Sequence, residues 1–236
     1  MKINISYFIL GAAIFAASCQ TEKRYDLRDY YFPVEKIDTN GLRYEYQSMR
    51  DDSLPPYILL VTKTIRDNKT LLLTTREEEG SISQKIEEEI VTNGTVCTKY
   101  TFYQPDSTGK MQEIKATINA QATTFFPFDV REKGGVYPFE LTFASPDNAA
   151  DSYTITKNRL FMGFKDYYWS GDNKTHRCAE FLTKTRILLN SSTEGSIAPE
   201  TLSNEYYAKG FGLIYVQTSA GKDKITEFGL KARRKN

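Results

Sequence analysis

Few residues of this chain have the types and spacing that enzymatic chemistry requires. His176 is the only histidine, so any Ser–His–acid arrangement would have to use it, and no Gly-x-Ser-x-Gly segment supplies a nucleophile. A metal site would need His or Cys residues in clustered spacing, which the sequence lacks. It also contains no glycine-rich loop of the kind that binds phosphates. We therefore predict that the protein is not an enzyme and uses no metal or cofactor.

Two acidic runs are the next candidates for chemistry. Paired carboxylates carry out glycoside hydrolysis, and the sequence places three glutamates together at 77–79 and again at 87–89. If residues 82–91 form a strand, Glu87 and Glu89 lie on one face, opposite Ile86 and Ile90. A solvated sheet face, or charges that protect an edge strand, explains both runs without catalysis.

Aromatic side chains form two dense groups that could bind a ligand. Such rings can line an apolar pocket or stack against a sugar. The alternative is that they fill the core of a large β domain, where Tyr and Phe are favoured. The two groups are Phe125, Phe126 and Phe128, and Tyr167, Tyr168 and Trp169.

The N-terminal segment differs from the rest of the chain. Lys2 is the only charged residue before position 19, and residues 3–15 are nearly all apolar. This apolar run suits a signal peptide, because a membrane-spanning helix needs roughly 20 apolar residues. Ala17-Ser18-Cys19 and the polar residues after it resemble the lipobox of bacterial lipoproteins. The resemblance implies cleavage after residue 18 and a lipid such as palmitate on Cys19. The alternative is an ordinary secretory signal that is cleaved at the same place.

Two further cysteines, Cys97 and Cys178, follow in the domain. An exported protein meets an oxidising environment, so these residues could form a disulfide. Two buried free thiols are the competing interpretation.

The charge balance bears on the partners of the chain. There are 31 Lys and Arg residues against 30 Asp and Glu residues, and removal of the segment with Lys2 leaves equal numbers. A net charge near zero gives no electrostatic reason to expect nucleic acid as a partner.

The remaining sequence is a succession of strand-like runs separated by turn signals. Asn93-Gly94 lies between two such runs and favours a type I′ hairpin. Short turns imply antiparallel neighbours, and a sheet of this size curls or folds into two layers. We predict an all-β, mainly antiparallel fold: a large curved meander sheet, as a half-barrel or sandwich, with few or no long helices after the signal peptide. The expected organisation is a signal peptide at 1–18, a lipidated tether at 19–40 and a single antiparallel β domain at 41–236.

A second resemblance comes from residues 206–215. Their pattern, Tyr-Ala-x-Gly-x-Gly followed by apolar residues, resembles a closing strand of many uncharacterised lipoproteins of Gram-negative bacteria. Gly210 and Gly212 would share one strand face, where missing side chains allow sharp curvature or close packing. The wider architecture resembles the LolA/LolB group, which implies a half-barrel around an apolar cavity.

Together these features predict a non-enzymatic, membrane-anchored lipoprotein of the cell envelope. We expect an outer-membrane location, facing the periplasm or the cell surface, and a curved sheet that binds an apolar ligand or a lipid. One alternative is a structural accessory subunit of an outer-membrane secretion, motility or uptake complex, with an envelope protein as its partner. The other is a carbohydrate-binding lipoprotein.

Overall fold

The computed structural model describes residues 22–51, 53–132, 135–148, 150–191, 195–221 and 224–236. The predicted signal peptide and Cys19 lie outside the described residues. Within them, no helix has the length and apolar character needed to cross a membrane.

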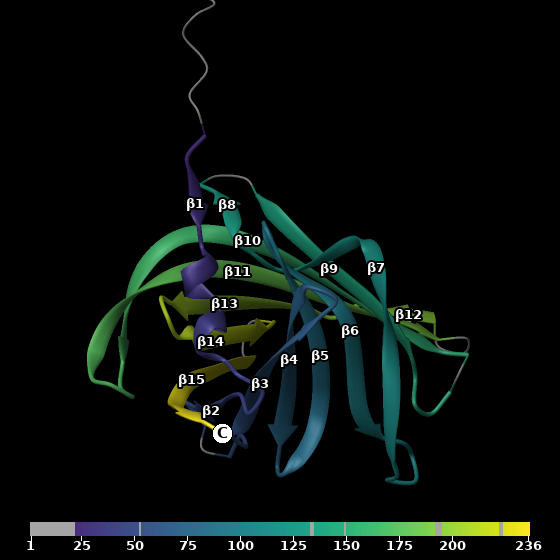
Figure 1. Cartoon of the computed structure of the whole chain (residues 1–236). Coiled ribbons are helices and arrows are strands. Elements are labelled where there is room, and N and C mark those ends of the chain that lie inside the picture. The colour runs from purple at the N-terminus through teal and green to yellow at the C-terminus, as the bar shows by residue number, and fades with distance from the viewer. Residues whose placement is uncertain (1–21, 52, 133–134, 149, 192–194, 222–223) are drawn as a thin grey trace, which may run out of the picture.

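Nearly all of the described chain belongs to one antiparallel meander. Its strands are β2 (Leu42–Ser48), β3 (Tyr57–Arg66), β4 (Lys69–Glu78), β5 (Ser81–Val91), β6 (Gly94–Pro105), β7 (Met111–Pro127), β9 (Val136–Ala144), β10 (Ser152–Trp169), β11 (Lys174–Ser191), β13 (Glu200–Ala208), β14 (Gly212–Ala220) and β15 (Lys224–Lys235). Each pairs with the next along the chain, and β15 pairs with β2, which closes a barrel of twelve strands. In Figure 1 the C-terminus accordingly lies beside β2. The short β12 (Gly195–Ile197) adds to β11.

The predicted all-β antiparallel fold is therefore confirmed, and its curvature extends beyond a half-barrel to full closure. Strand β2 shows why the sheet has a defined inner face. Leu42, Tyr44 and Tyr46 are buried and alternate with more exposed residues, as expected where successive side chains point to opposite faces. Closure pairs the first and last strands of the meander and so leaves neither with an open edge.

The longest hairpin consists of β10 and β11, with 18 residues each. The two strands arch across the molecule in Figure 1. Their pairing shifts register between Phe161 and Gly163, and Gly163 has a φ of +116°. A bulge of this kind bends a strand and increases its twist, and glycine tolerates the positive φ.

An N-terminal strap, residues 24–38, crosses one end of the barrel. It contains β1 (Arg24–Asp26) and two short 3-10 turns, η2 (Arg28–Tyr30) and η3 (Val34–Lys36), while β1 pairs with β8 (Asp129–Arg131) outside the ring. Hydrogen bonds fix the strap at successive points. The Leu27 amide donates to the Phe128 carbonyl at 2.7 Å, and Lys63 Nζ on β3 donates to the Val34 carbonyl at 2.8 Å. Residues that the sequence analysis assigns to the tether thus pack against the domain.

The barrel interior contains two apolar clusters. The strap-end cluster joins strap residues, among them Leu27, Tyr31, Phe32 and Ile37, to inward-facing residues of the sheet such as Tyr44, Phe126 and Phe181. The far cluster consists of Ile86, Cys97, Tyr100, Phe102, Phe139, Leu141 and Phe143.

Candidate binding chamber

Strand β10 shows how the barrel interior is layered. Its inward residues alternate along the strand: Ile155 packs against the far cluster, and Phe161 belongs to the strap-end cluster. Between them come Lys157 and Arg159, which line an internal cavity. The sequence therefore places two cations in the middle of an otherwise apolar barrel face.

This cavity, which we call the chamber, has a volume of about 410 Å³. Such a volume falls within the usual range for small-molecule sites. Its wall combines aromatic and aliphatic side chains with a layer of charged ones. The charged residues are Arg76 on β4, Glu88 on β5, Lys157 and Arg159 on β10, and Glu205 on β13.

Glu88 is the most deeply buried of these, with no exposed surface. Its carboxylate accepts hydrogen bonds from the Tyr31 hydroxyl at 2.7 Å and from Thr95 Oγ1 at 2.6 Å. Burial raises the pKa of Glu88 to about 7, although both hydrogen bonds act in the opposite direction. Burial also raises the pKa of Tyr31 well above its ordinary value, so its hydroxyl stays a donor. This contact links the strap to the charged layer.

Arg159 and Glu205 form the central ion pair of the chamber, with 3.2 Å between Nη2 and Oε2. The Tyr207 hydroxyl donates to the same Glu205 oxygen at 2.8 Å, and Arg159 also donates to the Phe125 carbonyl. Burial disfavours the charge of Arg159, but Glu205 opposes this effect, and the net result is a raised pKa. Each of these two side chains is about nine-tenths buried. Arg159 therefore stays charged inside the barrel.

The two remaining cations differ in their partners. Arg76 Nε lies 2.6 Å from Glu78 Oε1, and its guanidinium lies 4.0 Å from the centre of the Tyr57 ring. Lys157 Nζ forms no hydrogen bond and no ion pair with any residue in the described part of the chain. Burial lowers the pKa of Lys157, and the nearby Glu205 partly offsets this.

The predicted aromatic surface is distributed over several places. Only Phe125 of the six residues lines the chamber. Phe126, Phe128 and Trp169 are buried in the strap-end cluster, and Tyr167 packs against its rim. Tyr168 is 58% exposed. The two groups therefore do not form one continuous platform.

The predicted cysteine and glycine sites are also located by the structure. Cys97 and Cys178 are buried free thiols, one in each apolar cluster, and the disulfide is not formed. The expectation that Gly210 and Gly212 share a strand face is wrong, because Gly210 lies in the turn between β13 and β14. Both adopt a positive φ, +75° and +92°, which glycine accepts without a Cβ clash. This turn receives the strap, since the Gly210 amide donates to the Asp29 carbonyl at 2.7 Å.

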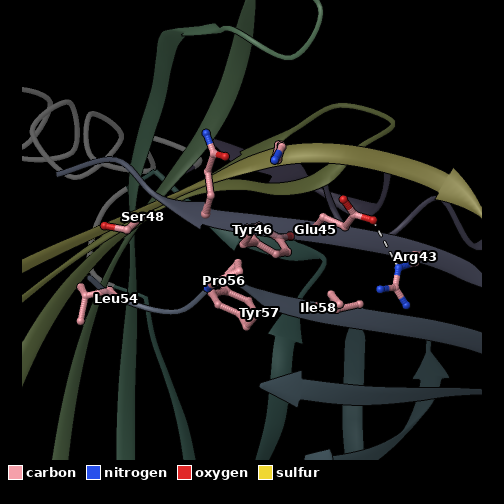
Figure 2. A pocket seen from close by; sticks show the side chains of 10 residues that line it. Arg43, Glu45, Tyr46, Ser48, Leu54, Pro56, Tyr57 and Ile58 are labelled. Atoms are coloured by element: carbon pink, nitrogen blue, oxygen red, sulfur yellow. Dashed lines mark hydrogen bonds and ion pairs between the residues drawn. The ribbon is translucent and has the colours of Figure 1, made fainter. Parts of the chain in front are cut away.

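A second concavity of about 430 Å³ lies between β2, β3 and β15. Figure 2 shows Arg43 and Glu45 at one end of it and Tyr46 and Tyr57 within it. Arg43 Nε lies 3.3 Å from Glu45 Oε1, and Arg234 Nη2 lies 3.0 Å from the other oxygen of Glu45. These charged side chains remain in contact with solvent. The chamber, with its buried charges, is the better candidate site.

The described residues contain no group of three or more His, Cys, Asp or Glu side chains placed to hold a metal ion. His176 instead lies 2.9 Å from the Asp172 carboxylate within a hairpin and packs 5.1 Å from the Phe211 ring.

The charged layer was not predicted from the sequence, although a signal for it is present. Glu88 has the same parity as Ile86 and Ile90, and Lys157 and Arg159 have the same parity as Ile155 and Phe161. A charged residue at an apolar position of an alternating strand indicates an inward-facing charge.

Comparisons with known proteins support the fold. No family model and no curated protein matches the sequence. A provisionally named lipoprotein from Parabacteroides distasonis aligns with a TM-score of 0.51 at 10% identity, over 87% of this chain and 98% of that chain. This similarity shows a shared fold.

Two further solved structures align less well. One is an exported protein with a YmcC-like fold from Bacteroides fragilis, with a TM-score of 0.43 at 11% identity, over 87% of this chain and 99% of that one. The other is the hypothetical lipoprotein YmcC from Escherichia coli, with a TM-score of 0.36 at 9% identity, over 98% and 97%.

Proposed function

We propose that this chain is a lipid-anchored protein of the bacterial cell envelope that binds a small molecule inside its barrel. The observation that carries the binding role is the chamber, in which a charged layer lies between two apolar clusters. Charged side chains are costly to bury unless they are paired or have a use. Apolar residues in place of buried charges are often neutral or stabilising, so retention of the charged layer favours a role other than stability.

The side chains that line the chamber restrict the chemical class of ligand that it can bind. A purely apolar molecule would have to lie against Lys157 and leave its ammonium group without a hydrogen-bond acceptor. A molecule with both an apolar and a polar part can contact the rings and the charges together. The ligand that fits this wall is therefore amphipathic, which narrows the apolar ligand or lipid expected from the sequence.

The anchoring role rests on the segment that ends at Cys19. The name of the Parabacteroides protein with the shared fold agrees with it. Two or three acyl chains would hold the domain at a membrane without any apolar surface of its own, since each buried CH₂ contributes about 0.8 kcal/mol.

Mass spectrometry tests both halves of the proposal. The chain purified from bacterial membranes should carry a diacylglyceryl mass that Cys19→Ala abolishes and that Cys97→Ala, a matched control, retains. A native mass spectrum of the folded protein should show an extra mass of small-molecule size that denaturation releases. An unmodified Cys19 would contradict the anchor. The binding role would be contradicted if protein produced in several bacterial hosts showed no bound small molecule in its native mass spectrum.

A further inference from the structure

The chamber contains more unused donors than unused acceptors. Each of its two buried carboxylates is already engaged: Glu205 by Arg159 and Tyr207, and Glu88 by Tyr31 and Thr95. A ligand that approached with donors would therefore have to displace bonds inside the protein.

The donors are in a different situation. Lys157 Nζ has no hydrogen bond or ion pair with any described residue. Two further polar atoms of chamber residues, Arg159 Nε and Thr74 Oγ1, are buried and have no hydrogen-bond partner in the structure. A buried polar group without a partner is costly, and these three atoms would gain most from an acceptor.

The charges of the chamber lead to the same conclusion. Arg159 is balanced by Glu205, and Arg76 by Glu78. Glu88 accepts hydrogen bonds from the neutral Tyr31 and Thr95 hydroxyls and forms no ion pair with a described residue. Lys157 is thus the one cation of the layer, among the described residues, that lacks a direct counter-ion.

Apolar and aromatic side chains make up much of the chamber wall. Phe125 and Tyr100 lie toward the far cluster, and Leu59 and Phe228 line the chamber as well. A molecule held by Lys157 would therefore place its remaining atoms against rings and aliphatic side chains, where burial is favourable.

We propose that the ligand of the chamber is an amphipathic anion, whose carboxylate or similar acidic group binds Lys157 and whose apolar part lies against Phe125 and its neighbours. This inference rests on the proposed function and specifies the chemical class of its ligand. The negative group supplies the acceptor that Lys157 lacks, and a charge-assisted hydrogen bond in a low-dielectric chamber is stronger than one in water.

The test compares an anion with its neutral counterpart. The probes are 4-phenylbutyrate, 4-phenylbutyramide, in which a neutral carboxamide of nearly the same shape replaces the carboxylate, and acetate, which lacks the apolar part. Their affinities for the full-length chain carrying Cys19→Ala are measured by ligand-observed NMR titration. We expect the acid to bind at least about tenfold more tightly than the amide, since only the carboxylate accepts a hydrogen bond in which both groups are charged, and also more tightly than acetate.

Three variants locate this preference. Lys157→Met should abolish the difference between acid and amide, whereas Lys157→Arg should keep it because the charge remains. Lys115→Met is the matched control, since this lysine is 82% exposed on β7, and it should leave the difference unchanged. Lys157→Met should fold, because the residue it removes takes part in no ion pair.

Each result has a defined meaning. Equal affinities for the acid and the amide in the parent chain would overturn the inference while leaving a binding chamber in place. A preference that survives Lys157→Met, or equally tight binding of acetate, would overturn it too. If neither compound binds, the inference fails, and the native mass spectrum separately decides whether the chamber has a ligand at all.

Discussion

Replacement of Glu88 by glutamine should stabilise the protein at alkaline pH. The carboxyl is fully buried, and its pKa in the folded protein is about 7 against an ordinary value of 4.5. Folding therefore favours the protonated form. The contribution of Glu88 to stability is complete below pH 4.5 and is lost as the pH rises through 7. Since one pKa unit corresponds to about 1.4 kcal/mol, the loss between pH 4 and pH 8.5 is about 3 kcal/mol.

Glutamine has the shape of the protonated carboxyl and does not ionise. Glu88→Gln should therefore unfold at nearly the same urea concentration as the parent at pH 4, and be more stable by up to about 3 kcal/mol at pH 8.5. The assay is urea denaturation followed by far-UV circular dichroism, with the variant and the parent compared at each pH. Because the variant and the parent are compared at the same pH, the contributions of all other titrating groups to the free energy of unfolding cancel.

Glu89→Gln is the matched control. Glu89 is the next residue on β5 and lies 2.9 Å from Lys69 Nζ near the surface. Loss of such an ion pair should change the free energy of unfolding by less than about 1 kcal/mol. The reasoning is refuted if Glu88→Gln is less stable than the parent at pH 8.5, or if its effect is the same at both pH values.

Two further predictions concern the cysteines and the turn that receives the strap. Burial raises the pKa of Cys97 and Cys178 to about 12. Neither thiol should therefore react with dithionitrobenzoate at pH 8 until the chain is denatured. Rapid labelling of either thiol in the native protein would contradict its burial. Gly212→Ala should cost more than about 1 kcal/mol in urea unfolding, because a Cβ at a φ of +92° would lie 3.3 Å from a strap ring. A Cβ added at Gly210 would meet no atom within 4 Å, so Gly210→Ala should lower the free energy of unfolding by less. If Gly210→Ala proved the more destabilising of the two, the strap would not pack against Gly212.

The local elements were predictable because their signals are local. Asn93-Gly94 between two strand-like runs predicted the hairpin that the structure confirms as β5 and β6. Alternation in β2 likewise specifies which side chains face inward. In each case the deciding interactions lie within a few residues of one another.

The charged layer was harder to predict because its partners are distant in sequence. Tyr31, which donates to Glu88, lies 57 positions away and in a segment that its composition assigns to the tether. A run of three glutamates also suggests solvent, although the parity of the middle one places it among isoleucines. Parity gives the side of the strand, but the burial of that side depends on the closure of the whole sheet.

Ring closure itself has a consequence for when the protein can fold. The pairing of β2 with β15 brings together residues as far apart as Glu45 and Arg234, which are 189 positions apart. Until β15 has been synthesised, β2 has no partner on one side, and contacts at such sequence separation form slowly. The ring therefore stays open while the strands between β2 and β15 emerge. Closure of the barrel is thus a late step of folding.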